Sequence, residues 1–439
     1  MDYAQTIEYL FNSVTSFQQV GASAYKPGLE RVEAFCHYMG HPERDFLTIH
    51  VAGTNGKGST SHMIASVLQS AGYRVGLYTS PHLRDFRERM RVDGEMISEK
   101  EVVCFVGEHK PKIEELQLSF FEITTVMAFD FFSRSDVEVA VIETGLGGRL
   151  DATNVITPVL SVVTNIGLDH TEFLGSTLPE VATEKAGIIK YGTAVILGES
   201  SEDYDFVFEK RAEEVGSRLI YAEREFECQM TDASAGSEEQ KMQKMQQMLL
   251  TRLRDGKRFE VELDLLGDYQ YHNIVTASAA LDYLHQHTAL TIPSHAYLSG
   301  LSSVVESTHL QGRWQTLSEN PLVICDTGHN AHGLKYVMAE LERRTQGAGK
   351  VICVIGFAKE KDLSTVLPLM PRGAYYIFTQ ASVSRALSAE ELASQAGQYG
   401  LKGEVVWSVA EALAMAKQMA QVDDMIFVGG SNFVVAEVL

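Results

Sequence analysis

One stretch of the sequence joins an apolar strand candidate, a glycine-rich loop and the start of a helix. Residues 46–51 are the strand candidate, residues 53–58 read GTNGKG, and a helical pattern runs from about residue 59 to residue 71. Glycines let backbone N–H groups point into one concave nest, and a helix N-terminus adds partial positive charge. This order of elements predicts a phosphate-binding loop in an α/β protein.

The loop departs from the common pattern GxxxxGK[ST] at two positions. Val51 stands where the first glycine would fall, and Gly58 separates Lys57 from the hydroxyl residues. Lys57 is placed to neutralise phosphate charge, and Ser59 or Thr60 could hold the Mg²⁺ of a nucleotide. The alternative is a structural glycine-rich turn, which the flanking strand and helix disfavour. The expected nucleotide contacts in the loop are Gly53, Thr54, Asn55, Gly56, Lys57, Gly58, Ser59 and Thr60.

Apolar strand candidates alternate with helical segments along most of the chain. They are residues 73–78, 137–142, 159–164, 323–326, 351–355, 375–378 and 425–428. Such strands indicate parallel sheets covered by helices on both faces. We expect an α/β protein with a larger N-terminal phosphate-loop domain, residues 1–293, and a smaller C-terminal Rossmann-like domain, residues 294–439. The boundary is placed at a proline-containing break, residues 288–294, which precedes a new helix.

A polar segment, residues 223–257, interrupts this alternation. It is rich in Glu, Gln, Met, Ser and Arg. Within it, residues 234–239 are expected to form an exposed loop and residues 240–253 a surface helix. No function is suggested for it.

Composition excludes several functional classes. A formal net charge of −21 argues against a protein that binds the nucleic-acid backbone. The 5 cysteines are scattered and form no CxxC or Cys/His pattern, which fits a reducing compartment and gives no zinc signature. No apolar run approaches the roughly 18 residues of a membrane span, and no signal-peptide pattern is found. We expect a soluble cytoplasmic protein.

Five motifs resemble those of the folylpolyglutamate synthase/dihydrofolate synthase family of the Mur ligase superfamily, in the family's order. They are HVAGTNGKGS at residues 50–59, TSPHL at 79–83, ETGLGGRLDATN at 143–154, GLDHTEFLG at 167–175 and EKAGI at 184–188. The lead-in YKPGLE at residues 25–30 also matches, so the resemblance covers nearly the whole chain.

The resemblance implies a ligase that joins L-glutamate to dihydropteroate or to tetrahydrofolate, with poly-γ-glutamylation, in folate biosynthesis. It implies ATP and two Mg²⁺ ions, an acyl-phosphate intermediate, and release of ADP and phosphate. Because an anionic carboxylate must approach an anionic phosphate, the protein must mainly position its substrates and neutralise charge. A bifunctional enzyme and a monomer are expected.

The resemblance also implies a metal site. Glu143 ends an apolar strand candidate, and α/β proteins place their ligands at strand ends. The alternative for Glu143 is an ordinary carboxylate on the surface. A lone histidine such as His170 is more often structural than a ligand. The family match assigns Mg²⁺ binding to Ser80, Glu143 and His170, with Ser59 from the loop. It further implies that Lys185, which otherwise reads as a solvated helix lysine, is carbamylated by CO₂ and binds metal. The expected catalytic residues are Lys57, Glu143, His170 and Lys185.

Substrate contacts follow from the same resemblance. By spacing alone, Phe121 and Phe129 would be core residues of one helix, and Arg313 could be a surface arginine. The implied contacts are Phe121, Glu122, Gly148, Arg149 and Asp151 for the folate, Asn273, Arg313 and Asp326 for ATP, and His329, Arg385 and Ser431 for glutamate.

Some residues depart from the family's pattern, and two other enzyme classes compete with this interpretation. Tyr269, Gly328 and Ser384 are the departures, and they bear on fine substrate preference. A Mur-type ligase for a peptidoglycan precursor needs an additional N-terminal domain, and only residues 1–52 precede the loop. A phosphate-loop NTPase that switches or transports would leave the motifs around Glu143 and Lys185 unexplained.

Overall fold

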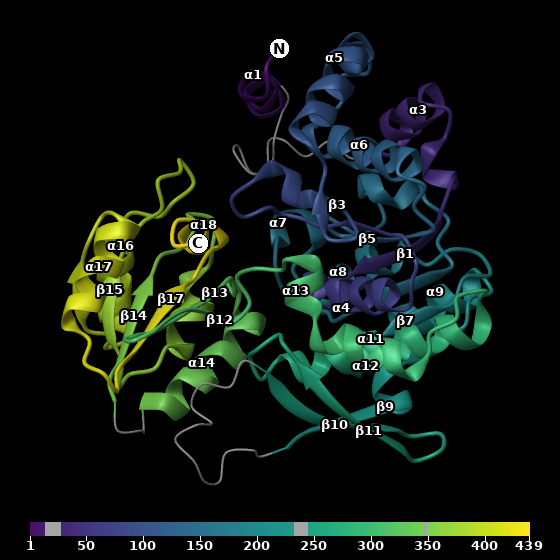
Figure 1. The fold of residues 1–439 in the computed structure, drawn as a ribbon. Coiled ribbons are helices and arrows are strands. Elements are labelled where there is room, and N and C mark those ends of the chain that lie inside the picture. Colours follow the sequence, from purple (N-terminus) through teal and green to yellow (C-terminus); the bar gives the residue numbers. More distant parts are fainter. Residues whose placement is uncertain (14–27, 232–244, 346–348) are drawn as a thin grey trace. The chain divides into compact units, whose positions relative to one another are not determined.

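The computed structural model describes residues 1–13, 28–231, 245–345 and 349–439, which form two compact units (Figure 1). The first unit comprises the described parts of Met1–Ala233, Gln246–Asp264 and Tyr271–His309. The second comprises Leu265–Gln270 and the described parts of Leu310–Leu439. Each unit is built around its own sheet.

The first unit is organised by an eight-stranded sheet of order β4-β3-β2-β5-β1-β6-β7-β8. Its strands are β1 (Leu47–Ala52), β2 (Val75–Tyr78), β3 (Met90–Val92), β4 (Glu95–Met96), β5 (Val139–Glu143), β6 (Leu160–Val163), β7 (Val195–Leu197) and β8 (Leu219–Tyr221). All pair in parallel except β3 and β4, which add an antiparallel edge. The expected strands are confirmed to within two residues at each end. Because β1 lies between β5 and β6, the loop after β1 opens at a topological switch point, where α/β sheets bind ligands.

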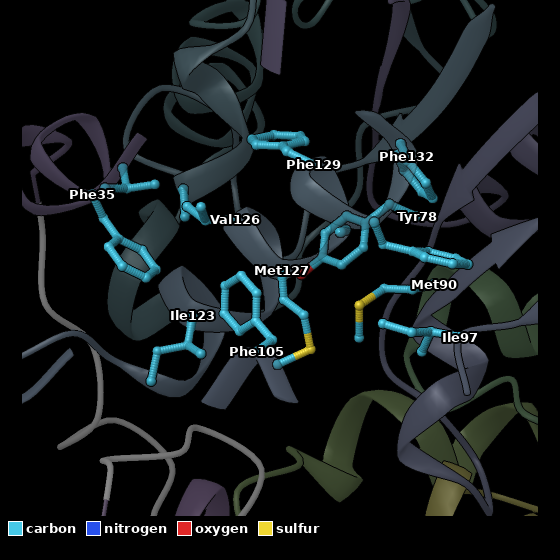
Figure 2. Packing of buried hydrophobic residues seen from close by; sticks show 14 of the residues in the cluster. Phe35, Tyr78, Met90, Ile97, Phe105, Ile123, Val126, Met127, Phe129 and Phe132 are labelled. Atoms are coloured by element: carbon cyan, nitrogen blue, oxygen red, sulfur yellow. The ribbon is translucent and has the colours of Figure 1, made fainter. Parts of the chain in front are cut away.

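Helices cover this sheet because its central strands are apolar on both faces. The helices are α1 (Tyr3–Glu8), α3 (Glu30–Tyr38), α4 (Lys57–Ser70), α5 (Glu99–Leu116), α6 (Phe120–Arg134), α7 (Thr171–Leu174), α8 (Leu178–Ala186), α9 (Asp205–Glu214), α10 (Ala222–Glu225), α11 (Gln270–His287), α12 (Ser294–Ser302) and α13 (Val304–Thr308). Figure 2 shows one core cluster, in which Phe129 and Phe132 of α6 lie with Tyr78 of β2 and Phe105 of α5. Burying each large apolar side chain contributes roughly 1.5–3 kcal/mol.

The last helices of the first unit extend it beyond the expected boundary. Ser66 Oγ of α4 donates to Gly300 O of α12 at 2.6 Å, and His62 Nδ1 lies 2.7 Å from Thr308 Oγ1 of α13. A Cβ on Gly300 would lie 2.5 Å from Val67 Cα, so α12 lies directly on α4. The helix expected after the proline break is confirmed, but the division falls after His309 rather than after residue 293.

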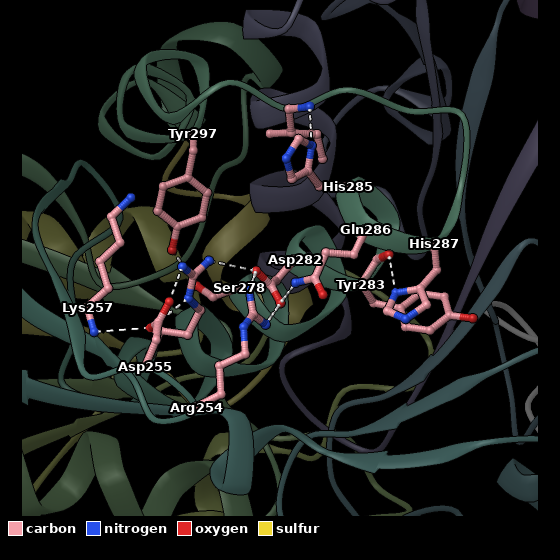
Figure 3. Close-up of polar contacts among 12 residues, drawn as sticks. Arg254, Asp255, Lys257, Ser278, Asp282, Tyr283, His285, Gln286, His287 and Tyr297 are labelled. Carbon is pink, nitrogen blue, oxygen red and sulfur yellow. Dashed lines mark hydrogen bonds and ion pairs between the residues drawn. The ribbon is translucent and has the colours of Figure 1, made fainter.

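The polar segment contains strands where a helix was expected. β9 (Phe226–Met230), β10 (Gln246–Arg252) and β11 (Lys257–Leu263) form an antiparallel three-stranded sheet. The helix expected over residues 240–253 is therefore wrong for β10, where Met248 and Leu250 are buried with the period of two of a strand. Residues 234–239 and 240–244 lie outside the described residues. Arg254 pairs with Asp282 of α11 (Figure 3), and Arg252 of β10 pairs with the same carboxylate at 3.1 Å, so these contacts tie the sheet to the helix.

The second unit has a six-stranded sheet of order β12-β13-β17-β14-β15-β16, parallel except for β12. Its elements are β12 (Gln315–Glu319), β13 (Leu322–Asp326), α14 (Ala331–Thr345), β14 (Val351–Ile355), α15 (Leu363–Val366), β15 (Tyr375–Phe378), α16 (Ala389–Gln398), β16 (Gly403–Val405), α17 (Val409–Met419), β17 (Met425–Gly429) and α18 (Asn432–Ala436). Successive residues of β14 face different cores: Cys353 packs with α14, and Val354 with α17 and α18. This two-sided burial confirms the expected Rossmann-like architecture. Within the described parts of the chain, no helix has the length and apolarity to cross a membrane.

Candidate active site

The phosphate loop connects β1 to α4 and depends on two glycines. Gly53 has a φ of +150° and Gly56 a φ of +77°, conformations that favour glycine. A Cβ on Gly53 would lie 1.8 Å from Thr164 Oγ1, and one on Gly56 would lie 2.2 Å from Asn273 Oδ1. The structure therefore places Asn273 of α11 against the loop.

Residues at the end of β6 hold the loop from the other side. Thr54 N–H donates to Asn165 O at 3.0 Å, and Asn55 N–H donates to Asn165 Oδ1 at 2.9 Å. Thr164 Oγ1 donates to Asn55 O at 2.6 Å. The amides of the first turn of α4 have no intrahelical acceptor, and the helix N-terminus is partially positive, so this end of the loop suits an anion. The sequence did not single out Thr164 and Asn165, because the only feature that distinguishes them in the sequence is their position directly after a buried strand.

Two lysines converge on one carbonyl oxygen of the loop. Lys57 Nζ donates to Gly53 O at 3.0 Å, and Lys185 Nζ donates to the same oxygen at 2.8 Å. Lys185 is 3% exposed, so the alternative of a solvated helix lysine is wrong. Burial, and then the charge of Lys57, lowers the pKa of the Lys185 amine to about 7. Two amines this close to each other favour an anionic ligand beside them.

Glu143 and Ser80 meet at the ends of β5 and β2. Glu143 is 4% exposed, and its Oε2 accepts a hydrogen bond from Ser80 N–H at 3.1 Å. Thr144 N–H donates to Val51 O at 2.9 Å, which brings the end of β5 to the strand that enters the phosphate loop. Glu143 is therefore a buried carboxylate on the ligand side of the sheet, and the alternative of a surface carboxylate is wrong.

The described residues offer oxygen ligands rather than a preformed metal cage. No three His, Cys, Asp or Glu side chains among them are grouped to hold a metal ion. Ser59 is buried at the start of α4, and the buried Thr60 Oγ1 has no hydrogen-bond partner. His170 has a left-handed φ of +51° and is the N-cap residue that precedes α7, and its N–H donates to Asp169 Oδ1 at 2.9 Å. Carboxylate and hydroxyl oxygens suit Mg²⁺, which keeps several waters as ligands.

The glycine-rich loop after Glu143 is packed against α6 and α8. A Cβ on Gly145 would lie 2.4 Å from the Phe121 ring, and one on Gly148 would lie 2.8 Å from Glu184 O. Arg149 is half-exposed, and its guanidinium pairs with Glu184 at 2.7 Å. Phe121 is only partly buried and borders the loop, whereas Phe129 belongs to the core.

Two carboxylate side chains that were expected to contact the folate are buried and hydrogen-bonded within the protein. Asp151 accepts hydrogen bonds from the N–H groups of Gly145 at 2.9 Å and Leu146 at 2.8 Å. Glu122 closes the capping box of α6 and pairs with Arg31 at 3.0 Å. Both side chains therefore organise the loop and the helix beside it.

In the second unit, Asp326 at the end of β13 joins three neighbouring groups. It accepts hydrogen bonds from Tyr269 Oη at 2.6 Å, Trp314 N–H at 2.8 Å and Gly328 N–H at 2.7 Å. Burial raises the pKa of Asp326 above its usual value. Tyr269, a departure from the family pattern, thus has a local role that the sequence did not show.

The other expected residues of the second unit lie on loops at strand ends. Arg313 hydrogen-bonds Thr327, and His329 Nδ1 lies 3.0 Å from Thr327 O. Arg385 pairs with Glu360. Ser431 Oγ accepts a hydrogen bond from Val434 N–H at 3.2 Å and caps the N-terminus of α18.

Comparison with known families and curated proteins identifies close relatives. The model of the Mur ligase middle domain matches residues 51–281, and the model of the Mur ligase glutamate ligase domain matches residues 312–432. A folylpolyglutamate synthase of Lacticaseibacillus casei is 30% identical over 448 residues, covering 100% of this chain and 98% of the relative. A probable bifunctional folylpolyglutamate synthase/dihydropteroate synthase of Haloferax volcanii is 33% identical over 443 residues, and the chain spans 50% of its length.

Solved structures show the same fold with ligands bound. E. coli FolC in complex with DHPP and ADP has a TM-score of 0.83 and 30% identity, covering 100% of this chain and 97% of that one. A bifunctional folylpolyglutamate synthase/dihydrofolate synthase with Mn, AMPPNP and L-glutamate bound has a TM-score of 0.81 and 28% identity, with the same coverage.

Proposed function

This chain belongs to the folylpolyglutamate synthase/dihydrofolate synthase family of Mur ligases, and we propose that it uses ATP to join L-glutamate to dihydropteroate or a reduced folate. One observation carries the proposal: Lys57 and Lys185 converge on Gly53 O at the N-terminus of α4, beside a loop held open by glycines. Solved structures with DHPP and ADP bound, or with Mn, AMPPNP and L-glutamate bound, share this fold.

The reaction proceeds in two steps. A carboxylate oxygen of the pterin substrate attacks the γ-phosphorus of ATP, the bond to ADP breaks, and an acyl phosphate forms. The glutamate nitrogen then attacks the acyl carbon, phosphate leaves, and the amine loses a proton. Both steps bring anions together, so the amides of the first turn of α4 and the Lys57 ammonium act by neutralising phosphate charge.

A divalent cation fits the oxygen atoms that the first unit presents. Glu143 supplies the buried carboxylate, and Ser80 and the hydroxyls of Ser59 and Thr60 lie at neighbouring strand and helix ends. Bound there, Mg²⁺ would neutralise phosphate oxygens and hold them in line with the attacking carboxylate. We assign two Mg²⁺ ions to the site, with His170 as a further ligand.

Lys185 is suited to carbamylation. With a pKa of about 7, a large fraction of its amine is neutral at physiological pH. A neutral amine can add to CO₂ with release of one proton, and the resulting carbamate would present an anionic oxygen ligand in place of the amine. This change would remove the repulsion between Lys185 and Lys57.

The other assignments concern substrates. Phe121, Gly148 and Arg149 contact the folate, with Glu122 and Asp151 shaping the site; Asn273, Arg313 and Asp326 serve ATP; and His329, Arg385 and Ser431 serve glutamate. The enzyme adds glutamate to both pterin forms and acts as a cytoplasmic monomer.

Phosphate release from ATP and Mg²⁺ tests the proposal. The purified protein is assayed with dihydropteroate or tetrahydrofolate, each with and without L-glutamate. Release that requires both a pterin substrate and glutamate is the expected result, and the more active pterin identifies the dominant step. Release indifferent to both substrates would overturn the ligase assignment and indicate an NTPase.

A further inference from the structure

We propose that Glu199 is a positioning residue for the nucleotide: it determines which way the Asn165 side-chain amide faces and thereby holds the phosphate loop in its binding shape. Glu199 lies in none of the five motifs and stands two residues after the end of the short strand β7. The inference rests on the proposed nucleotide site, and it adds a residue that acts through Asn165 rather than by touching the nucleotide.

The topology brings the three partners together. β1, β6 and β7 are adjacent and parallel, so their carboxyl ends lie at the same edge of the sheet. The phosphate loop follows β1, Asn165 follows β6, and Glu199 follows β7. Asn165 therefore lies between the loop on one side and Glu199 on the other.

The chemistry of the partners leaves Asn165 one orientation. Glu199 Oε1 accepts a hydrogen bond from Asn165 Nδ2 at 2.9 Å, and Asn165 Oδ1 accepts one from Asn55 N–H at 2.9 Å. A carboxylate only accepts hydrogen bonds, and a backbone N–H only donates. Reversing the amide would place oxygen against oxygen at Glu199 and hydrogen against hydrogen at Asn55. Glu199 thus selects the orientation that the loop needs.

Glu199 is itself held in place by its backbone. Its N–H donates to Thr164 O at 3.0 Å, and its carbonyl accepts from Tyr204 Oη at 3.0 Å. A Cβ on the preceding Gly198 would lie 2.3 Å from Thr164 O, so β6 and β7 approach closely at this point. The carboxylate therefore stands on a rigid part of the sheet edge and not on a free loop.

The orientation of Asn165 affects the residues that would bind phosphate. Asn55 lies directly before Gly56 and Lys57, and both its backbone groups are held, the N–H by Asn165 and the C=O by Thr164 Oγ1. If the N–H lost its acceptor, the peptide could rotate and the first turn of α4 would lose its defined start. Losing one hydrogen bond of about 1 kcal/mol would weaken nucleotide binding by roughly 5-fold.

A polarity swap tests this role. In Asn165→Asp, two carboxylates face each other, and we expect at least a tenfold weaker affinity for ADP. In the double variant Asn165→Asp with Glu199→Gln, the Gln amide can donate to the new carboxylate, which still accepts from Asn55 N–H. We expect the double variant to recover to within about 3-fold of wild type, since one hydrogen bond of the same kind replaces the other.

The measurements are the ADP dissociation constant by calorimetry, the KM for L-glutamate and the melting temperature. Glu202→Gln, at an exposed position three residues further along the chain, is the charge control and should leave all three unchanged. The double variant has the net charge of wild type, so its recovery reports on orientation. Equal loss of ADP affinity in the single and double variants, or a parallel loss of melting temperature and glutamate KM, would overturn the role. Failure of the wild-type protein to bind ADP would instead overturn the nucleotide site itself.

Discussion

Replacing the buried Lys185 by methionine should stabilise the protein, and the gain should shrink as the pH rises. The amine has a pKa of about 7 in the folded protein against 10.5 for a free lysine. Between these values the unfolded chain binds more protons than the folded one, so the wild-type protein becomes more stable with rising pH. At roughly 1.4 kcal/mol per pKa unit, the lowered pKa of Lys185 reduces the free energy of unfolding by about 4 kcal/mol at pH 7 and by about 2 kcal/mol at pH 9.

Urea unfolding in CO₂-free buffer at pH 7 and pH 9 measures this difference. Lys185→Met has no amine at this position, so its stability advantage over wild type should fall by about 2 kcal/mol between the two pH values. The same variant should lose ligation, because stability and activity conflict at such a site. Lys210→Met, at an exposed position of α9, is the control and should show no such trend. A stability difference that is constant or grows with pH would refute the argument that Lys185 is buried with a lowered pKa.

Three further substitutions address the loop and the second unit. Lys57→Ala should abolish ligation while circular dichroism and melting temperature stay those of wild type; near-normal turnover would contradict the assignment of Lys57 to phosphate. Gly56→Ala forces a Cβ against Asn273 and should raise the KM for ATP at least tenfold. The control is Gly72→Ala, where φ is similar but the surrounding space is open; it should lower the free energy of unfolding by about 1 kcal/mol and leave the KM for ATP unchanged. Tyr269→Phe removes the hydrogen bond to Asp326 and should lower the unfolding free energy by about 1 kcal/mol, measured by urea titration; an unchanged value would mean that Asp326 keeps its position without Tyr269.

The sequence predicted the architecture where the hydrophobic pattern was strong. Apolar runs that alternate with helical segments predicted β1, β2, β5 and β6 of the first sheet and β13, β14, β15 and β17 of the second, because parallel strands buried on both faces carry a strong hydrophobic pattern. The glycines around Lys57 predicted the loop. The pattern failed at residues 246–252: strands in a polar, half-exposed sheet carry a weak signal, and a mixed run of Gln, Met and Leu fits either period.

Some residues of the candidate site could likewise be nominated from the sequence, and others only from the folded structure. Lys57 and Glu143 could be nominated from the sequence because each stands at the end of a recognisable strand or in the loop that follows one, whereas Lys185 was nominated only by the resemblance to the family. That Lys185 is buried against Gly53 O depends on residues 132 positions apart meeting at the sheet edge. The sequence alone reads that lysine as solvated, since burial is a property of the assembled fold.

Asn165 and Glu199 illustrate the part that only tertiary structure decided. Nothing in the local sequence of either residue distinguishes it from a loop residue after a strand. Their roles arise because β1, β6 and β7 are neighbours in the sheet, which places a donor, an amide and a carboxylate in line. The sequence by itself determined the strongly apolar strands, the phosphate loop and the family. The strand order decided which side chains meet, because hydrogen bonds between strand ends depend on spatial neighbours and not on sequence neighbours.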